Sequence, residues 1–154
     1  MKKRRSAEGF TLIELLVVIT IIAILASLVL SVAGIVQQKA ARARAEAEIK
    51  AMEAGLESYK ADNGDYPTGT NLTTSSSGNN AFLFNALNGT NGSGKVYVEF
   101  QKNQTNSSGY IIDPFGNSYG YQYPGATNRS GTNFPDLFSV ANSSNNSNAW
   151  IKNW

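Results

Sequence analysis

Apolar side chains are concentrated near the start of this 154-residue chain. Of the 27 residues from 10 to 36, 21 are Ala, Val, Ile, Leu or Phe, and residues 15–36 form a run of 22 without a charge. At about 1.5 Å per residue, a helix of that length reaches roughly 33 Å, enough for a bilayer hydrocarbon core of about 30 Å. The pattern therefore predicts a membrane-spanning helix over residues 10–36.

A second helical pattern follows without a break over residues 37–61, which are rich in Ala, Glu, Lys and Arg and contain no Pro. Its apolar positions recur at spacings of three and four, so we expect this stripe to seat a small domain. They are Ala45, Ile49, Met52, Leu56 and Tyr59. The remaining surface predicts three ion pairs at i,i+4, namely Arg42–Glu46, Arg44–Glu48 and Glu46–Lys50. The helix is expected to stop at Asn63-Gly64.

The rest of the chain is rich in Gly, Ser, Thr and Asn and holds only short apolar runs. Residues 81–87 predict a short helix, and a tight antiparallel connection is expected at Gly116-Asn117. Four runs predict strands, at 96–100, 110–113, 119–123 and 137–140. A small antiparallel sheet packed on the amphipathic half of the helix makes the expected domain, residues 37–154, an α+β fold.

The composition removes several catalytic classes. The chain has no His and no Cys. There is thus no thiol nucleophile, no His-based triad, no Cys/His metal site and no disulfide framework. Enzymatic activity of these classes is therefore not expected.

Charge is divided unevenly between the first nine residues and the remainder. The formal net charge of +2 is the sum of +3 in residues 1–9, where Lys2, Lys3, Arg4 and Arg5 cluster, and −1 in residues 10–154. Positive segments next to a span stay on the cytoplasmic side, so the domain after the span should lie outside the cytoplasm. The remainder has no basic stripe, and direct binding of nucleic acid is not expected.

One carboxylate interrupts the start of the apolar stretch, at Glu14. A charge inside a membrane segment costs free energy, so such residues are usually functional and paired. A position at the headgroup boundary is the simpler alternative.

The residues around this carboxylate resemble a known processing motif. A basic leader ending in Gly9, then Phe10-Thr11-Leu12-Ile13-Glu14 and a long apolar run, is similar to the start of type IV pilins and of the pseudopilins of type II secretion. The resemblance implies that a membrane prepilin peptidase cuts between Gly9 and Phe10, removes residues 1–9 and methylates the new amine of Phe10. Glycine suits a scissile bond because it has no Cβ to obstruct the protease.

The resemblance also implies how the subunit assembles. After cutting, Phe10 carries a positive amine that is costly to bury alone, and Glu14 of a neighbouring chain is the matching negative charge. Pairing would set the register of a bundle of apolar helices. The implied partners are the peptidase, further copies of the chain, other pilins or pseudopilins and the inner-membrane assembly platform. The implied location is a single pass through the inner (cytoplasmic) membrane, followed by a filament.

Several segments resemble more narrowly the major pseudopilin of type II secretion; they are 56–67, 113–125, 136–139 and 153–154. Members of that group bind calcium through aspartates in the last loop. From Leu137 onward this chain has asparagines but no Asp or Glu, and calcium sites are built mainly on carboxylates. We therefore expect no cofactor, with a calcium site that is weak or absent, and we expect Trp150 and Trp154 to order the loop instead.

Other interpretations remain open. Ser31-Val32-Ala33 is a small-x-small triplet at which a signal peptidase could release a soluble domain. Asp113 and Asp136 could be paired acids acting on a glycan beside Tyr121 and Tyr123. A membrane-anchored or secreted surface-binding domain, like an adhesin, is the main alternative to a filament subunit, and a pilus or DNA-uptake filament is the alternative to a secretion pseudopilus.

Overall fold

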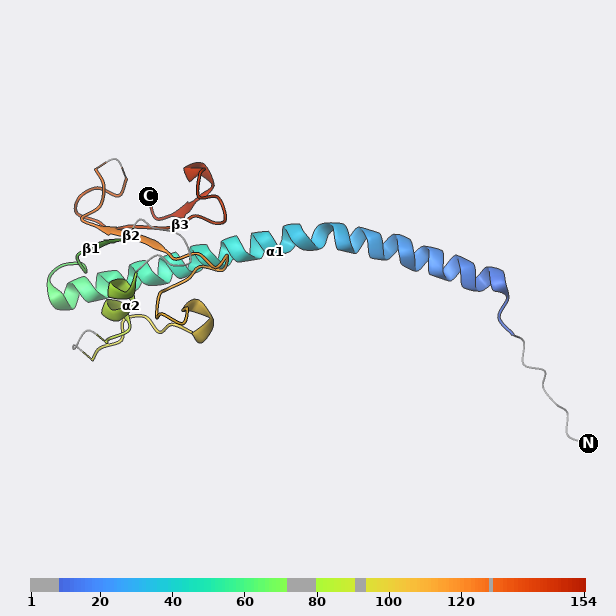
Figure 1. Ribbon diagram of the computed structural model, residues 1–154, viewed down its shortest axis with the longest axis horizontal. Coiled ribbons are helices and arrows are strands. Elements are labelled where there is room, and N and C mark those ends of the chain that lie inside the picture. The colour runs from blue at the N-terminus through green and yellow to red at the C-terminus, as the bar shows by residue number, and fades with distance from the viewer. Residues whose placement is uncertain (1–8, 72–79, 91–93, 128) are drawn as a thin grey trace, which may run out of the picture. The chain divides into compact units, whose positions relative to one another are not determined.

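The computed structural model describes residues 9–71, 80–90, 94–127 and 129–154, apart from the side chains of residues 31, 32, 70 and 71. The chain divides into two compact units, one up to Lys39 and one from Ala40 to Trp154. Helix α1, Leu12–Asn63, contributes to both (Figure 1). The basic cluster at residues 2–5 lies outside the described residues.

The first unit contains the apolar half of α1. Between residues 10 and 36, each large apolar side chain that the structure describes is about half exposed or more, from 47% at Val18 to 86% at Phe10. An 18-residue window of the helix has a mean hydropathy of 3.1, so it meets the length and composition of a membrane-spanning helix. This half of α1 has a surface suited to lipid or to other apolar helices.

The second unit packs a small antiparallel sheet on the amphipathic half of α1, which confirms the predicted α+β fold. Figure 1 shows the sheet beside this half of the helix. In spatial order its strands are β1 (Gly69–Asn71), β2 (Gly120–Tyr123), β3 (Asp136–Ser139) and β4 (Ile151–Lys152). Three short helices complete the unit, namely α2 (Ala81–Leu87) and the 3-10 turns Lys102–Gln104 and Ser147–Ala149.

The predicted apolar stripe of α1 forms the centre of the core. Ala45, Ile49, Met52 and Leu56 are buried, each with 1% or less of its surface exposed. The fifth member, Tyr59, is half-buried and packs edge-on against Tyr97, with 5.3 Å between ring centroids. Residues from α2, from the sheet and from the segment just before β2 close the same cluster; they include Leu83, Leu87, Tyr119, Tyr121, Leu137 and Ile151.

Two of the four predicted strands are present. Strands β2 and β3 lie within a residue of the predicted 119–123 and 137–140, and Tyr121 faces Leu137 in their antiparallel register. The strand predicted at 96–100 is wrong. The N–H groups of Tyr97 and Val98 both donate to the carbonyl of Leu87, so this segment caps the end of α2. Its apolar residues pack on the core without joining the sheet.

The strand predicted at 110–113 is also wrong, since it forms only the isolated bridges Thr105–Ile111 and Ile112–Ser118. The tight connection after it is confirmed. The N–H of Asp113 donates to the carbonyl of Asn117 at 2.7 Å, and Gly116 in the turn has a φ of +85°, a value that favours glycine.

Helix boundaries follow the sequence signals closely. Helix α2 has the predicted bounds. Helix α1 ends at Asn63, and Gly64 takes a left-handed φ of +85° while its N–H donates to the carbonyl of Lys60 at 2.7 Å. The predicted cap at Asn63-Gly64 is thus confirmed.

Only one of the three predicted ion pairs is found among the described residues. Arg44 and Glu48 pair at 2.8 Å. Lys50 instead pairs with Glu53 at 2.7 Å, and Arg42 donates to the carbonyl of Ala149 at 2.9 Å, because the folded domain offers this guanidinium a carbonyl that an isolated helix lacks.

Two buried phenols in the core of the second unit give a prediction for alkaline pH. The hydroxyl of Tyr119 donates to Glu48 Oε2 at 2.6 Å and that of Tyr121 donates to the carbonyl of Pro67 at 2.8 Å, and neither side chain is exposed. Burial raises the pKa of both phenols, and for Tyr119 the hydrogen bond to Glu48 raises it further. Their protons therefore stay bound in the folded state at pH values where the unfolded chain has lost them.

We predict that the free energy of unfolding falls as pH rises above about 10, the pKa of an unfolded tyrosine. As pH rises, the free energy of unfolding of the wild type should fall more steeply than that of Tyr121→Phe, by about 1.4 kcal/mol per pH unit, because the variant lacks one of the two retained phenol protons. Urea unfolding of the detergent-solubilised chain, followed by tryptophan fluorescence, measures both slopes. Equal slopes for wild type and variant would contradict the assignment.

Candidate assembly site at the start of the long helix

The first turn of α1 is closed by a reciprocal capping box between Thr11 and Glu14. The backbone N–H and the hydroxyl of Thr11 donate to Glu14 Oε2 at 2.8 and 2.7 Å. The N–H of Glu14 in turn donates to Thr11 Oγ1 at 3.3 Å. Two backbone N–H groups that a helix start leaves without an intrahelical partner are thereby satisfied, and the carboxylate lies at the positive end of the helix dipole.

The capping box holds the Glu14 carboxylate without using all of it. Both bonds from Thr11 fall on Oε2, and within the described part of the chain no residue donates to Oε1. The side chain borders a shallow groove of about 330 Å³ whose other lining residues are Phe10, Ile13, Val17 and Val18. A fixed carboxylate oxygen beside an apolar groove can accept a cationic donor from another molecule.

From the sequence, Glu14 is predicted either to pair with another chain or to lie at the headgroup boundary, and no role is predicted for Thr11. The structure adds a partner within the same chain. The sequence does contain a signal for this contact, because Thr followed three residues later by Glu, before an apolar run, is the capping-box pattern.

The predicted processing bond lies outside the helix. Helix α1 begins at Leu12, and its first backbone bond runs from the N–H of Leu15 to the carbonyl of Thr11. Gly9 and Phe10 precede it without secondary structure; both are exposed, and a Cβ placed on Gly9 would meet nothing within 4 Å. A peptidase can reach this bond without unwinding the helix. By contrast, the small-x-small triplet at 31–33 lies inside α1, which continues through it.

The two aspartates considered as paired acids each serve a separate turn. Asp113 is 3% exposed and accepts the N–H groups of Phe115 and Asn117 and the hydroxyl of Ser139, at 3.0, 2.8 and 2.5 Å. Burial raises the pKa of this carboxyl, and these hydrogen bonds oppose the rise. Its bonds explain the tight turn before β2 and leave no role for it as a catalytic acid.

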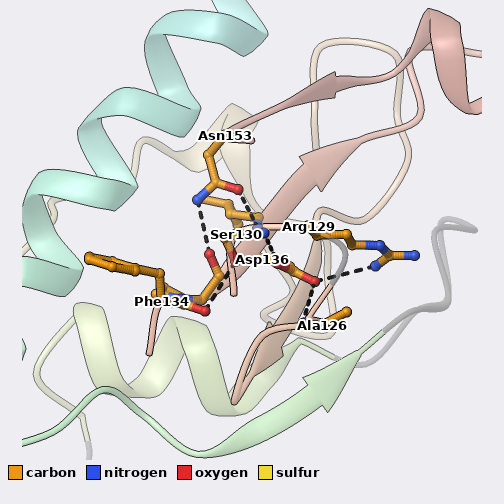
Figure 2. A network of polar contacts seen from close by, with 8 residues as sticks. Ala126, Arg129, Ser130, Phe134, Asp136 and Asn153 are labelled. Atoms are coloured by element: carbon orange, nitrogen blue, oxygen red, sulfur yellow. Dashed lines mark hydrogen bonds and ion pairs between the residues drawn. The ribbon is translucent and has the colours of Figure 1, made fainter. Parts of the chain in front are cut away.

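Asp136 is fully buried at the start of β3 and organises the preceding loop (Figure 2). Its carboxylate accepts the N–H groups of Ala126 and Ser130 at 3.0 and 3.1 Å, the hydroxyl of Ser130, and Arg129 Nη1 at 3.5 Å. Asn153 secures the C-terminal segment to the same place, donating to the carbonyl of Pro135 and accepting the N–H of Leu137. The network is structural, as expected for a turn residue.

The C-terminal loop does not fit a calcium ion. Within the described ranges, no three His, Cys, Asp or Glu side chains are grouped as a metal site requires. Two oxygen atoms of this loop that are not carboxylate oxygens already accept hydrogen bonds within the protein. Asn146 Oδ1 accepts the N–H of Asn148 at 3.1 Å, and the carbonyl of Ser143 accepts the indole N–H of Trp150 at 2.9 Å. Calcium needs six to eight such oxygens around one point.

Two family matches divide the chain near the boundary between its two structural units. The prokaryotic N-terminal methylation motif matches residues 4–30, and the model of type II secretion system protein G matches residues 34–154. The type II secretion system core protein G of Vibrio cholerae is 37% identical over 129 residues, which are 81% of this chain and 77% of that protein. Its counterpart in Pseudomonas aeruginosa is 35% identical over 127 residues, 80% and 78% of the two chains.

A third relative, the core protein G of Klebsiella michiganensis, is 47% identical over a shorter stretch of 66 residues, which are 43% of this chain and 46% of that protein. No solved structure matches the chain.

The capping box predicts a local effect of Thr11→Val, which keeps the shape of the side chain but removes its hydroxyl. Losing an N-cap costs about 1 kcal/mol, so hydrogen exchange at the amides of Glu14 and Leu15 should quicken about fivefold in detergent micelles. Thr20→Val is the matched control, because the Thr20 hydroxyl donates to the carbonyl of Leu16 within the helix and caps nothing. Unchanged exchange in Thr11→Val, or equal changes in both variants, would contradict the capping role.

Proposed function

Since this chain belongs to the protein G family of type II secretion systems, whose members are pseudopilins, we propose that it is made as a precursor, cut between Gly9 and Phe10, and assembled into a filament through Glu14. It is a structural subunit and not an enzyme. The single observation that carries the proposal is the fixed carboxylate of Glu14, which lies five residues beyond an exposed glycine and directly before the uncharged apolar stretch of residues 15–36.

Processing is proposed to occur at the cytoplasmic face by a prepilin peptidase. The match to the N-terminal methylation motif and the non-helical, exposed Gly9–Phe10 segment support this. Cutting there removes a leader of net charge +3 and leaves a chain of net charge −1. Methylation of the new amine on Phe10 leaves it positively charged, so the mature helix begins with one cation.

Pairing between subunits follows from the cost of isolated charges. An amine or a carboxylate left alone among apolar side chains costs several kcal/mol, and breaking a buried pair by removing one partner is strongly destabilising. In the proposed filament, the amine of one Phe10 meets Glu14 Oε1 of a neighbour while Thr11 retains Oε2. The capping box thus presents the carboxylate in one orientation, and the pair fixes the axial register of helices whose apolar surfaces would otherwise slide.

The remaining surfaces of the chain fit this arrangement. Before assembly, the apolar half of α1 is proposed to cross the inner membrane once, with the second unit outside the cytoplasm because the leader is basic. In the filament the same half packs against other pseudopilin helices, after an assembly platform in the membrane has delivered the subunit. The second unit, whose described core residues are buried within it, forms the filament surface.

The processing step predicts the mature N-terminus. In cells with an active prepilin peptidase, intact mass and N-terminal sequencing should show a chain that starts at Phe10 with one methyl group on its amine. Cells lacking the peptidase should retain the chain from Met1. A mature chain beginning at Gly34 would mean that a signal peptidase releases the domain instead.

The pairing step predicts a separation between cleavage and assembly. Glu14→Gln should be cut and remain in the membrane, yet filament recovery should fall about tenfold or more, because each amine loses its counter-charge. Thr20→Val, a conservative change in the same apolar stretch, should assemble normally. Normal filaments from Glu14→Gln would show that charge pairing is not required.

A further inference from the structure

The last loop of the chain, residues 140–150, adopts a shape that needs a source of order. Ala141 and Asn142 have φ values of +46° and +64°, a region that is unfavourable for an Ala side chain. Successive turns follow, in which the N–H groups of Ser143, Asn146 and Ala149 donate to carbonyls three residues earlier at 2.7, 3.1 and 3.0 Å. Turn hydrogen bonds at a surface are weak alone, so further contacts must hold this conformation.

Trp150 supplies such contacts at the end of the loop. Its ring stacks on Phe138, with 4.8 Å between centroids and only 5° between planes. Its indole N–H donates to the carbonyl of Ser143 at 2.9 Å. One side chain therefore binds the start of the loop through a hydrogen bond and the sheet through an aromatic stack.

Phe138, on which Trp150 stacks, is itself tightly packed. Phe138 on β3 is 1% exposed, and besides the Trp150 ring it contacts the ring of Trp154 edge-on, with 5.7 Å between centroids. Gly120 on the neighbouring strand makes room for it, since a Cβ at that position would clash with the Phe138 ring. The stack is thus built into the sheet and does not depend on the loop alone.

The two ends of the loop are secured as well. Ser139 pairs with Ile151 in the β3–β4 register, which brings the ends together. Arg42 Nη1 donates to the carbonyl of Ala149 at 2.9 Å and ties the loop to α1. The described contacts that hold the loop thus come from side chains and backbone groups of the protein itself.

We propose that residues 140–150 form a cation-independent loop closed by Trp150, and that the second unit reaches full stability without calcium. The resemblance above implies that relatives order the corresponding loop around a calcium ion. Here the loop has no carboxylate, and two of its oxygen atoms, Asn146 Oδ1 and the carbonyl of Ser143, already accept hydrogen bonds within the loop. The proposal concerns folding of the second unit and does not depend on how the filament assembles.

The first experiment compares urea unfolding of the full chain in detergent with excess EGTA and with millimolar calcium, followed by fluorescence of the two tryptophans. The unfolding constant should change by less than about twofold. A site with a Kd near 10 μM would lower it about a hundredfold at 1 mM calcium, by mass action. A stabilisation of that size in the wild type would overturn the proposal.

The second experiment tests whether Trp150 closes the loop. Trp150→Ala should raise the unfolding constant about thirtyfold and speed hydrogen exchange at the amides of Ser143 and Asn146, whereas Trp150→Phe, which keeps a ring for the stack, should cost only about fivefold. Trp154→Phe is the matched control and should leave exchange in the loop unchanged. Loop exchange that is equally slow in Trp150→Ala, or that calcium restores in this variant, would overturn the proposal.

Discussion

The apolar half of α1 cannot remain in water, and this constraint governs the rest of the molecule. Its large side chains are about half exposed or more in a single subunit, and burying each is worth about 1.5–3 kcal/mol. In the proposed function, lipid supplies that burial before assembly and neighbouring helices supply it afterwards. In either proposed setting Glu14 is the exception, because a carboxylate among apolar groups needs a partner. Thr11 holds it from within the chain, and the proposal adds an amine from a neighbouring chain.

Helix α1 also organises the second unit, because its surface changes along its length from mostly apolar to amphipathic. Beyond Lys39 its apolar side chains narrow to the stripe from Ala45 to Leu56, on which α2 and the sheet pack. Polar and aromatic contacts then fix the connections. Glu48 receives the Tyr119 hydroxyl, Asp136 gathers the loop before β3, and Trp150 closes the last loop on Phe138. These contacts hold the loops and the sheet of the second unit on the amphipathic half of α1.

Periodic features of this fold were predictable from sequence, and features created by tertiary contacts were not. The long helix, its Gly64 cap and the buried stripe follow from local chemistry. Strands β1 and β4 have only three and two residues, too short to show a period, and they exist because β2 and β3 offer edges to them. Residues 96–100 have the apolar composition of a strand because they pack on the core where they cap the end of α2. At the candidate site, its charge marks Glu14 in the sequence, whereas Thr11 is marked only by the three-residue spacing of a capping box.

The central claim, that Glu14 of one subunit meets the amine of another, can be tested by chemical coupling inside intact filaments. Filaments assembled from light and heavy-isotope-labelled subunits would be treated with an apolar carbodiimide, which joins a carboxylate to a nearby amine, and digested for mass spectrometry. The account predicts Phe10–Glu14 cross-linked peptides that combine one light and one heavy chain. Cross-links of uniform isotope composition alone, or none at Glu14 in intact filaments, would contradict it.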